Sequence, residues 1–287
     1  MAINWFPGHM HKARKEIKKV MPQMDLIIEV VDARIPFSSE NPLVPSLRGD
    51  TPLIKVLNKR DLADPAITEQ WLAWIEQERG VRALTLTHNQ RAEALGILKL
   101  AEEMTPNHDR EKGALRVMIL GIPNVGKSTL INTLAGRPVA NTGNEPAVTR
   151  AQQAIKLPNN ILLYDTPGFL WPKLSPEACG YRLAITGAIR SAVLDFEDVA
   201  LFEADYLMAA YPELAMARYG LTETPKNGLA LMDAIAVKRR FLGRGGVPDL
   251  HKVSEVLLNE FRNGTLGRIS LETPAMVERE LEQLQDT

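Results

Sequence analysis

The first two-thirds of the chain alternate short apolar runs with segments in which apolar residues recur at helical spacing. Runs rich in Val, Ile and Leu predict β-strands at residues 26–31, 53–57, 81–86, 116–120, 154–157 and 161–164. Because these runs are apolar on both faces, they are typical of parallel strands that helices cover on both sides. The alternation predicts a doubly wound α/β domain.

Helix signals lie between these runs. Asp64 and Pro65 are residue types preferred at the N-cap and the first position of a helix, and we expect that helix to end at Gly80. Another helix is expected over residues 126–134, with its stop near Gly136.

The pattern becomes helical from about residue 176 onward. Apolar stripes at helical spacing occupy residues 181–189, 229–237 and 253–261. We therefore predict two domains, an α/β domain over residues 1–174 and a small all-α domain over residues 175–287. The polar segment 105–113 is interpreted as a linker inside the first domain.

The string GIPNVGKS at residues 121–128 follows an apolar run and opens a helix, which is the context that a phosphate-binding P-loop needs. Lys127 would reach the β- and γ-phosphates, and Ser128 would ligate Mg²⁺. The other residues of this segment expected to contact the nucleotide are Asn124, Val125, Gly126 and Thr129.

The string DTPG begins at Asp165, directly after the run 161–164. Asp165 could hold Mg²⁺ through water, and the Gly168 amide could contact the γ-phosphate. Thr149 lies between the P-loop and this turn, and we expect it to ligate Mg²⁺ when the γ-phosphate is present. The alternative is that Thr149 carries a solvated loop hydroxyl.

The string NKRD, comprising Asn58, Lys59, Arg60 and Asp61, ends the run 53–57 and has the chemistry of a guanine reader. Asp61 could accept hydrogen bonds from N1–H and the N2 amine of guanine, whereas adenine would leave it unpaired. Thr87 and His88 lie where the loop behind the base is expected. Together with the P-loop, this motif favours GTP and GDP over ATP.

The guanine reader precedes the phosphate loop, which is the reverse of the order in Ras-like GTPases. The chain is therefore predicted to contain a circularly permuted Ras-like P-loop GTPase domain with a mostly parallel sheet.

The catalytic chemistry must differ from that of Ras, because Phe169 follows DTPG in place of the glutamine that orients water. The Asn124 side-chain oxygen could bind a monovalent cation beside the phosphates, or the side chain could bond only its own loop. His9 could orient water or move a proton near neutral pH. From composition alone, a surface histidine is the better interpretation of His9.

Six strings together resemble the YlqF/RbgA family of circularly permuted ribosome-assembly GTPases: NWFPGHM at 4–10, DARIP at 32–36, NKRD, GIPNVGKS, PAVTR at 146–150 and DTPGFLWPK at 165–173. The likeness runs from Asn4 to about Lys173 and continues loosely through the helical tail. It implies GTP hydrolysis coupled to late maturation of the large (50S) ribosomal subunit. It also implies a catalytic role for His9, potassium binding at Asn124, and a helical domain that meets ribosomal RNA.

Composition narrows the possible partners. The net charge of −1 creates no overall attraction to nucleic acid, so RNA contacts would come from local patches. Two basic stretches are candidates, and either could instead be a solvated helix face: Lys12, Arg14 and Lys15 near the start, and Lys238, Arg239, Arg240 and Arg244 in the tail. A single cysteine, no signal-peptide pattern and no long apolar run predict a cytoplasmic protein without a membrane partner. We expect a monomer.

Two other classes of function stay open. Phe169 in place of glutamine motivates a nucleotide-gated RNA- or ribosome-binding protein that barely hydrolyses GTP. A GTPase acting on another RNA, such as tRNA, or on a membrane transporter is the other alternative, and the lack of a long apolar run argues against transport.

Overall fold

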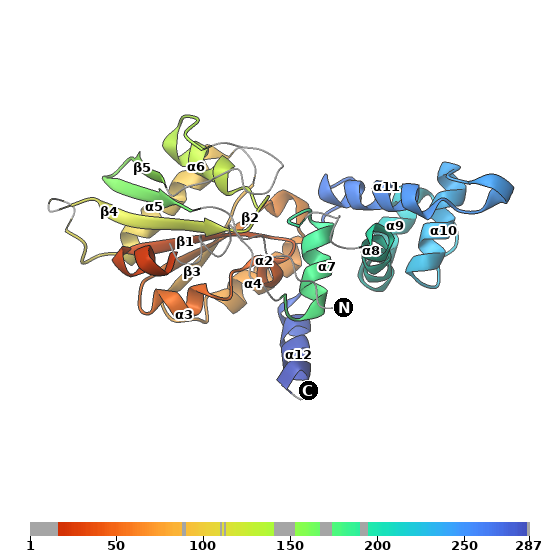
Figure 1. The fold of residues 1–287 in the computed structure, drawn as a ribbon, viewed down its shortest axis with the longest axis horizontal. Coiled ribbons are helices and arrows are strands. Elements are labelled where there is room, and N and C mark those ends of the chain that lie inside the picture. The colour runs from red at the N-terminus through yellow and green to blue at the C-terminus, as the bar shows by residue number, and fades with distance from the viewer. Residues whose placement is uncertain are drawn as a thin grey trace.

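The computed structural model describes residues 17–87, 90–109, 111, 113–140, 153–166, 174–189 and 195–285. In this part of the chain an α/β part (residues 17–166) and a group of helices lie side by side in an elongated molecule (Figure 1). Within these ranges, none of the helices combines the length and the apolar character needed to cross a membrane.

A six-stranded sheet with the order β3-β2-β1-β4-β6-β5 forms the centre of the α/β part. All neighbouring strands are parallel except β5 and β6. All residues of β1 are buried, as a central strand covered on both faces requires. The strands are β1 (Leu26–Asp32), β2 (Leu53–Asn58), β3 (Val81–Thr85), β4 (Leu115–Gly121), β5 (Gln153–Leu157) and β6 (Ile161–Asp165). The predicted strands and the mostly parallel sheet are therefore confirmed.

Helices connect the strands and cover both faces of the sheet. Figure 1 shows α5 and α6 on one side and α3 and α4 on the other. The short helix η1 (Met21–Gln23) precedes β1, and the connecting elements are α2 (Pro36–Ser39), α3 (Val44–Arg48), η2 (Arg60–Leu62), α4 (Pro65–Ile75), α5 (Arg91–Met104) and α6 (Lys127–Ala135). The α6 bounds confirm the helix expected after the phosphate loop, and Gly136 follows its end in a left-handed conformation.

Helix α4 begins as predicted but ends earlier. The Asp64 carboxylate caps the helix by accepting hydrogen bonds from the amides of Ala66 and Ile67. The predicted end at Gly80 is wrong, because α4 stops at Ile75. Gly80 has a φ of 76°, and its carbonyl accepts a hydrogen bond from the amide of Leu53 at 3.0 Å. The helix must stop before this residue because the Gly80 carbonyl already pairs with β2, directly before β3 begins at Val81.

Helix α7 lies between the sheet and a helical part made of α8–α11, with α12 below it (Figure 1). The elements are α7 (Glu177–Ile185), α8 (Phe196–Ala210), α9 (Pro212–Tyr219), α10 (Gly228–Arg239), η4 (Arg244–Gly246), α11 (Leu250–Arg262) and α12 (Pro274–Gln285). The predicted stripes at 229–237 and 253–261 fall within α10 and α11. The stripe at 181–189 outlasts α7, because Gly187 turns the chain with a φ of 77°.

The chain returns to the α/β part after α11. The amide of Ile269 donates to the Leu62 carbonyl at 3.0 Å, and the amide of Leu271 donates to the Arg34 carbonyl at 2.9 Å. Helix α12 then packs against α4. The last described segment of the predicted second domain thus contacts the first, and the boundary between residues 174 and 175 stays a prediction.

A buried ionic cluster fastens α7 to this returning segment. Arg182 of α7 donates to Glu280 of α12 at 2.9 and 2.5 Å and lies 3.4 Å from Glu272. The Glu272 carboxylate also accepts from the amides of Phe37 and Ser38 at 2.6 and 3.0 Å. Burial raises the pKa of Glu272 to about 7, although Arg182 opposes that shift. The cluster therefore links α2, α7 and α12.

Candidate functional site

The carboxyl ends of β1, β2, β4 and β6 meet at the edge of the sheet that faces α7 (Figure 1). In the sheet register, Asp32 at the end of β1 pairs with Asn58 at the end of β2, and Asp165 ends β6 beside β4. The NKRD, GIPNVGKS and DTPG strings therefore start from one edge. Such an edge is where open parallel sheets hold their ligands.

The phosphate loop requires glycine at position 126. Gly126 has a φ of 96°, and a Cβ atom there would lie 2.2 Å from the Asn58 Nδ2 atom. The close approach lets Asn58 Nδ2 donate a hydrogen bond to the Val125 carbonyl at 2.8 Å. The loop leads directly into α6, and a helix N-terminus favours a phosphate because its amides and its dipole are positive.

Lys59 joins the NKRD motif to the same loop. Its ammonium donates to the Asn124 carbonyl at 2.8 Å and to the Asp32 carboxylate at 2.9 Å. Asp61 is exposed and makes no hydrogen bond or ion pair with any described residue. The backbone of Leu86 bonds to that of Leu57 and Arg60, which places the following Thr87 beside the NKRD loop.

Lys127 and Asp165 form a buried ion pair at the base of the phosphate loop. Burial lowers the pKa of Lys127, while the Asp165 carboxylate acts to raise it. Thr166 donates to the Ile119 carbonyl at 2.9 Å and so holds the start of the DTPG string against β4. Ser128 and Thr129 are half-buried on the first turn of α6. The structure thus brings together the cation predicted to bind phosphate and the carboxylate predicted to hold magnesium.

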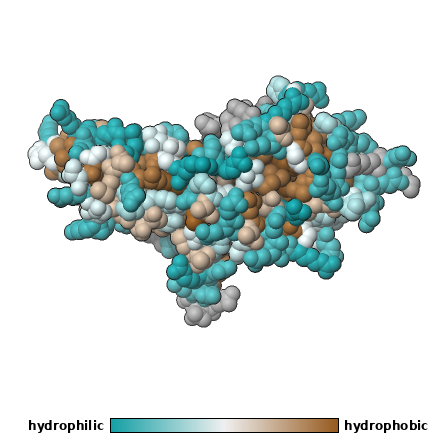
Figure 2. Space-filling model, turned by 180° about the vertical axis from the view of Figure 1, so that it is seen from behind, coloured by the Kyte–Doolittle hydropathy of each residue, from teal (hydrophilic) through white to brown (hydrophobic). Residues whose placement is uncertain are grey.

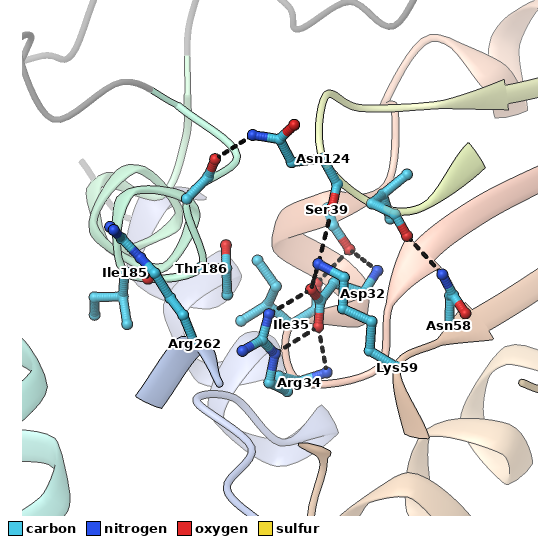
Figure 3. A network of polar contacts seen from close by, with 12 residues as sticks. Asp32, Arg34, Ile35, Ser39, Asn58, Lys59, Asn124, Ile185, Thr186 and Arg262 are labelled. Atoms are coloured by element: carbon cyan, nitrogen blue, oxygen red, sulfur yellow. Dashed lines mark hydrogen bonds and ion pairs between the residues drawn. The ribbon is translucent and has the colours of Figure 1, made fainter. Parts of the chain in front are cut away.

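Asp32 forms a second buried ionic group next to Lys59 (Figure 3). Its carboxylate accepts hydrogen bonds from Arg34 Nε at 2.9 Å and Nη2 at 2.8 Å. Burial alone would raise the pKa of Asp32, but the Arg34 and Lys59 cations hold it well below its usual range. Sequence reasoning gave Asp32 and Arg34 no role. The available signal was the place of Asp32, directly after a strand predicted to lie in the same sheet as the NKRD strand.

Asn124, the candidate cation ligand, contacts the end of α7. Its Nδ2 atom donates to the Gly187 carbonyl at 2.8 Å (Figure 3). Arg262 of α11 supports this turn from the other side by donating to the Ala184 and Ile185 carbonyls, each at 2.8 Å. Gly187 and Arg262 were not singled out from the sequence, because no local pattern links them to the phosphate loop.

The tail residues predicted to meet RNA are all exposed at the far end of the helical part. Lys238 and Arg239 lie in the last turn of α10, Arg240 caps that helix, and Arg244 lies in η4. Exposed Val237 and Val247, at 62% and 63%, lie among them. Figure 2 shows this end, on the left, as a mixture of hydrophilic and hydrophobic atoms.

Some predicted functional residues lie outside the described ranges, so their roles stay predictions: His9, Lys12, Arg14, Lys15, His88, Thr149, Gly168 and Phe169.

Comparison with known proteins gives similarities over nearly the whole chain. Residues 116–217 match the family described as 50S ribosome-binding GTPase. The chain is 43% identical to the ribosome biogenesis GTPase A of Priestia megaterium, with 98% of this chain and 100% of the relative covered. It is 32% identical to that of Thermotoga maritima, with 95% of each chain covered. A GNP-bound YlqF from T. maritima shares 28% identity and a TM-score of 0.63, over 92% of this chain and 98% of that structure.

Proposed function

Because the chain belongs to the ribosome biogenesis GTPase A family, we propose that its nucleotide state controls its binding to and release from the precursor of the large ribosomal subunit. Membership of this family makes the protein a GTP-hydrolysing enzyme of large-subunit assembly. The finer proposal is that it acts late in assembly and that hydrolysis accompanies release.

The observation that carries the proposal is the direct link between the guanine motif and the phosphate loop. Asn58 and Lys59 hold the Val125 and Asn124 carbonyls at 2.8 Å each. The base-reading and phosphate-binding segments therefore share a fixed spacing, which a single nucleotide needs. Asp61 would read guanine, and Thr87 and His88 would lie behind the base.

The residues at the phosphate loop fit a bound Mg²⁺–GTP. Gly126 leaves the backbone cradle open, and the buried Lys127–Asp165 pair supplies a cation for the phosphates and a carboxylate for the metal. Val125, Gly126, Thr129 and Gly168 would contribute backbone contacts, and Ser128, Thr149 and Asp165 would hold Mg²⁺. The metal would neutralise negative charge that develops on the transferred phosphoryl group.

Two side chains would replace the missing glutamine. Asn124 would help bind K⁺ beside the phosphates, where a positive charge stabilises the transition state. His9 would orient the attacking water. Neither role depends on the side chain at position 169.

RNA contact would come from the two basic stretches, of which the one in the tail is exposed at the end of the molecule far from the sheet. Cations beside exposed apolar side chains can bind phosphates and also pack against bases. We propose that the protein works as a cytoplasmic monomer.

The first prediction is that 50S subunits stimulate GTP turnover, and that they do so more strongly in potassium than in sodium. Turnover would be measured with and without subunits in each salt. Lys127→Ala is expected to weaken GTP binding, because no other cation is buried at the loop in the described residues. His9→Ala is expected to leave binding intact and to lower turnover.

The matched control is Arg279→Ala, because Arg279 lies on α12 and donates to the Ala275 carbonyl of its own helix. This variant should keep the wild-type response. Intact GTP binding without stimulation in any condition would instead favour the nucleotide-gated binding protein that barely hydrolyses.

A further inference from the structure

Two polar routes leave the same residue of the phosphate loop and end on consecutive residues of α11. One starts at the main-chain carbonyl of Asn124, and the other starts at its side-chain Nδ2 atom. They end at Phe261 and Arg262. Figure 3 shows Asn124 above the Asp32 network, with the α7 turn and Arg262 beside it.

The first route runs through the half-buried Lys59 and then through the buried charges of Asp32 and Arg34. Lys59 bridges the Asn124 carbonyl and the Asp32 carboxylate, and Asp32 holds Arg34. The Arg34 guanidinium then lies 4.9 Å from the centre of the Phe261 ring and 3.5 Å from its carbonyl. A buried guanidinium stacked on a ring has little freedom, so this route places α11 against the NKRD loop.

The second route runs through the last turn of α7. Arg262 donates to the Ala184 and Ile185 carbonyls, and Ile185 is fully buried. The Arg262 guanidinium also lies next to Gly187: a Cβ atom at Gly187 would come 3.5 Å from the Arg262 Nε atom. Two residues after Ile185, the Gly187 carbonyl accepts the hydrogen bond from Asn124.

Glu203 of α8 is a buried carboxyl group close to the same two guanidiniums. It is fully buried, its two oxygens have no hydrogen-bond partner among the described residues, and the cations that act on it are Arg262 and Arg34. Burial raises the pKa of Glu203, and both Arg262 and Arg34 oppose that shift. The Arg262 guanidinium therefore interacts with a buried carboxyl group of α8 as well as with the two carbonyls of α7.

We propose that Arg262 is a positioning residue for GTP hydrolysis, which holds the α7 turn so that Gly187 fixes the rotation of the Asn124 amide. An amide is planar, so a nitrogen committed to Gly187 keeps the side-chain oxygen on the opposite side. That oxygen is the atom that would bind K⁺. The inference rests on the proposed role of Asn124 as a cation ligand, and it gives the helical part a path by which to control that ligand.

The test is a double-mutant cycle between Arg262→Ala and Asn124→Ala, measured off the ribosome. Two quantities are compared in potassium and in sodium: kcat, and the Kd of a fluorescent non-hydrolysable GTP analogue. The potassium response is the change in these quantities between sodium and potassium. Each single change is expected to reduce this response by about 2- to 30-fold, the range of couplings carried by packed networks. The double variant should respond no less than Asn124→Ala alone.

Two further variants separate positioning from folding. Arg262→Lys keeps one donor for the two carbonyls and should restore part of the potassium response. Arg218→Ala is the control. Arg218 of α9 donates to Glu260 at 2.9 and 2.5 Å, and Glu260 lies on α11, the helix that carries Arg262, but Arg218 makes no such bond to α7 among the described residues. It should lower the Tm and leave the potassium response unchanged.

The outcomes distinguish this inference from the proposed function. A potassium response that survives in Asn124→Ala would overturn both the cation-ligand role and the positioning role. A response that is lost in Asn124→Ala but kept in Arg262→Ala would overturn the positioning role alone. Additive losses in the double variant would also overturn it.

Discussion

Two buried carboxyl groups of this protein differ in the direction of their pKa shift, and among the described residues only one of them forms ion pairs with cations. Asp32 accepts hydrogen bonds from both Arg34 and Lys59, which hold its pKa well below its usual range. Glu203 is equally buried but has no hydrogen-bond partner in the part of the chain that the structure describes, and burial raises its pKa to about 8 despite the nearby Arg262 and Arg34 cations. At the scale of single residues, the cations decide which buried carboxylate stays ionised, because the Coulomb attraction and hydrogen bonds of Arg34 and Lys59 outweigh burial at Asp32, whereas burial outweighs the cations at Glu203.

The neutral state of Glu203 predicts a pH dependence of stability. The unfolded chain ionises this residue above its ordinary value of 4.5, whereas the folded protein keeps it neutral up to about 8. Its contribution to the unfolding free energy is therefore complete below pH 4.5 and is lost as the pH rises to 8. We expect Glu203→Gln to flatten this part of the stability profile, as measured by urea unfolding at several pH values.

The groups that act on Glu203 are Arg262, Arg34 and Glu260, and all three stay in place in this variant. Asp198→Asn removes an exposed carboxylate from the same helix and serves as the control. Since each unit of pKa corresponds to about 1.4 kcal/mol, wild type and Glu203→Gln should diverge measurably between pH 5 and 8. Parallel profiles would show that Glu203 is ionised in the folded protein.

At the scale of elements, local pattern was sufficient for the strands and for the phosphate loop. Apolar runs located β1 to β6 within about two residues, because a covered parallel strand has a distinctive composition. The end of α4 was misplaced, because the pairing of Gly80 with Leu53 depends on the neighbouring strand. The contact between Asn124 and Gly187 was missed for the same kind of reason: it depends on how α7 packs.

The ionic cluster of α7 is the clearest case of a feature that local pattern cannot show. Ser38 and Glu272 are 234 residues apart in sequence, and Arg182 and Glu280 are 98 apart. Charged residues in an amphipathic helix are ordinarily read as solvent-facing, yet Arg182 is 1% exposed. Only the return of the chain after α11 brings the acceptors to it.

Arg182→Ala is therefore expected to destabilise the protein by about 3–5 kcal/mol, the cost of breaking a buried ion pair by removing one partner. The change would leave Glu272 buried without its cation. The free energy of unfolding in urea is the measurement, and Arg279→Ala on α12 is the control. A loss below about 1 kcal/mol would show that solvent compensates the remaining carboxylates.

At the scale of the whole molecule, charge is distributed unevenly although its sum is only −1. The edge of the sheet at which β1, β2, β4 and β6 end lies in the middle of the elongated structure (Figure 1). The basic tail residues lie at the end of the helical part: Lys238, Arg239, Arg240 and Arg244. An RNA bound there would not touch the nucleotide. Any influence on hydrolysis would have to pass through the helices in between, of which α8 and α11 both contact α7.

RNA binding at this end should depend on salt. For the double variant Arg240→Ala/Arg244→Ala, the slope of log affinity against log salt should become shallower by about 1.4–1.8, since each phosphate contact contributes about 0.7–0.9. The measurement is a salt titration with a fragment of ribosomal RNA. Lys99→Ala, an exposed change on α5, should leave the slope unchanged. An unchanged slope in the double variant would mean that these arginines do not contact phosphate.

The ionic cluster around Arg182 also constrains how the protein is made. Arg182 is translated 98 residues before Glu280, and at about 5–20 residues per second this interval lasts roughly 5–20 s. Until Glu272 and Glu280 emerge, the Arg182 guanidinium has neither of its carboxylate partners and must stay hydrated. The nascent chain can thus form its phosphate loop well before α7 is held beside it by the ionic cluster. During this period the edge of the sheet that carries the NKRD and GIPNVGKS strings is formed, but α7 is not yet fixed next to it.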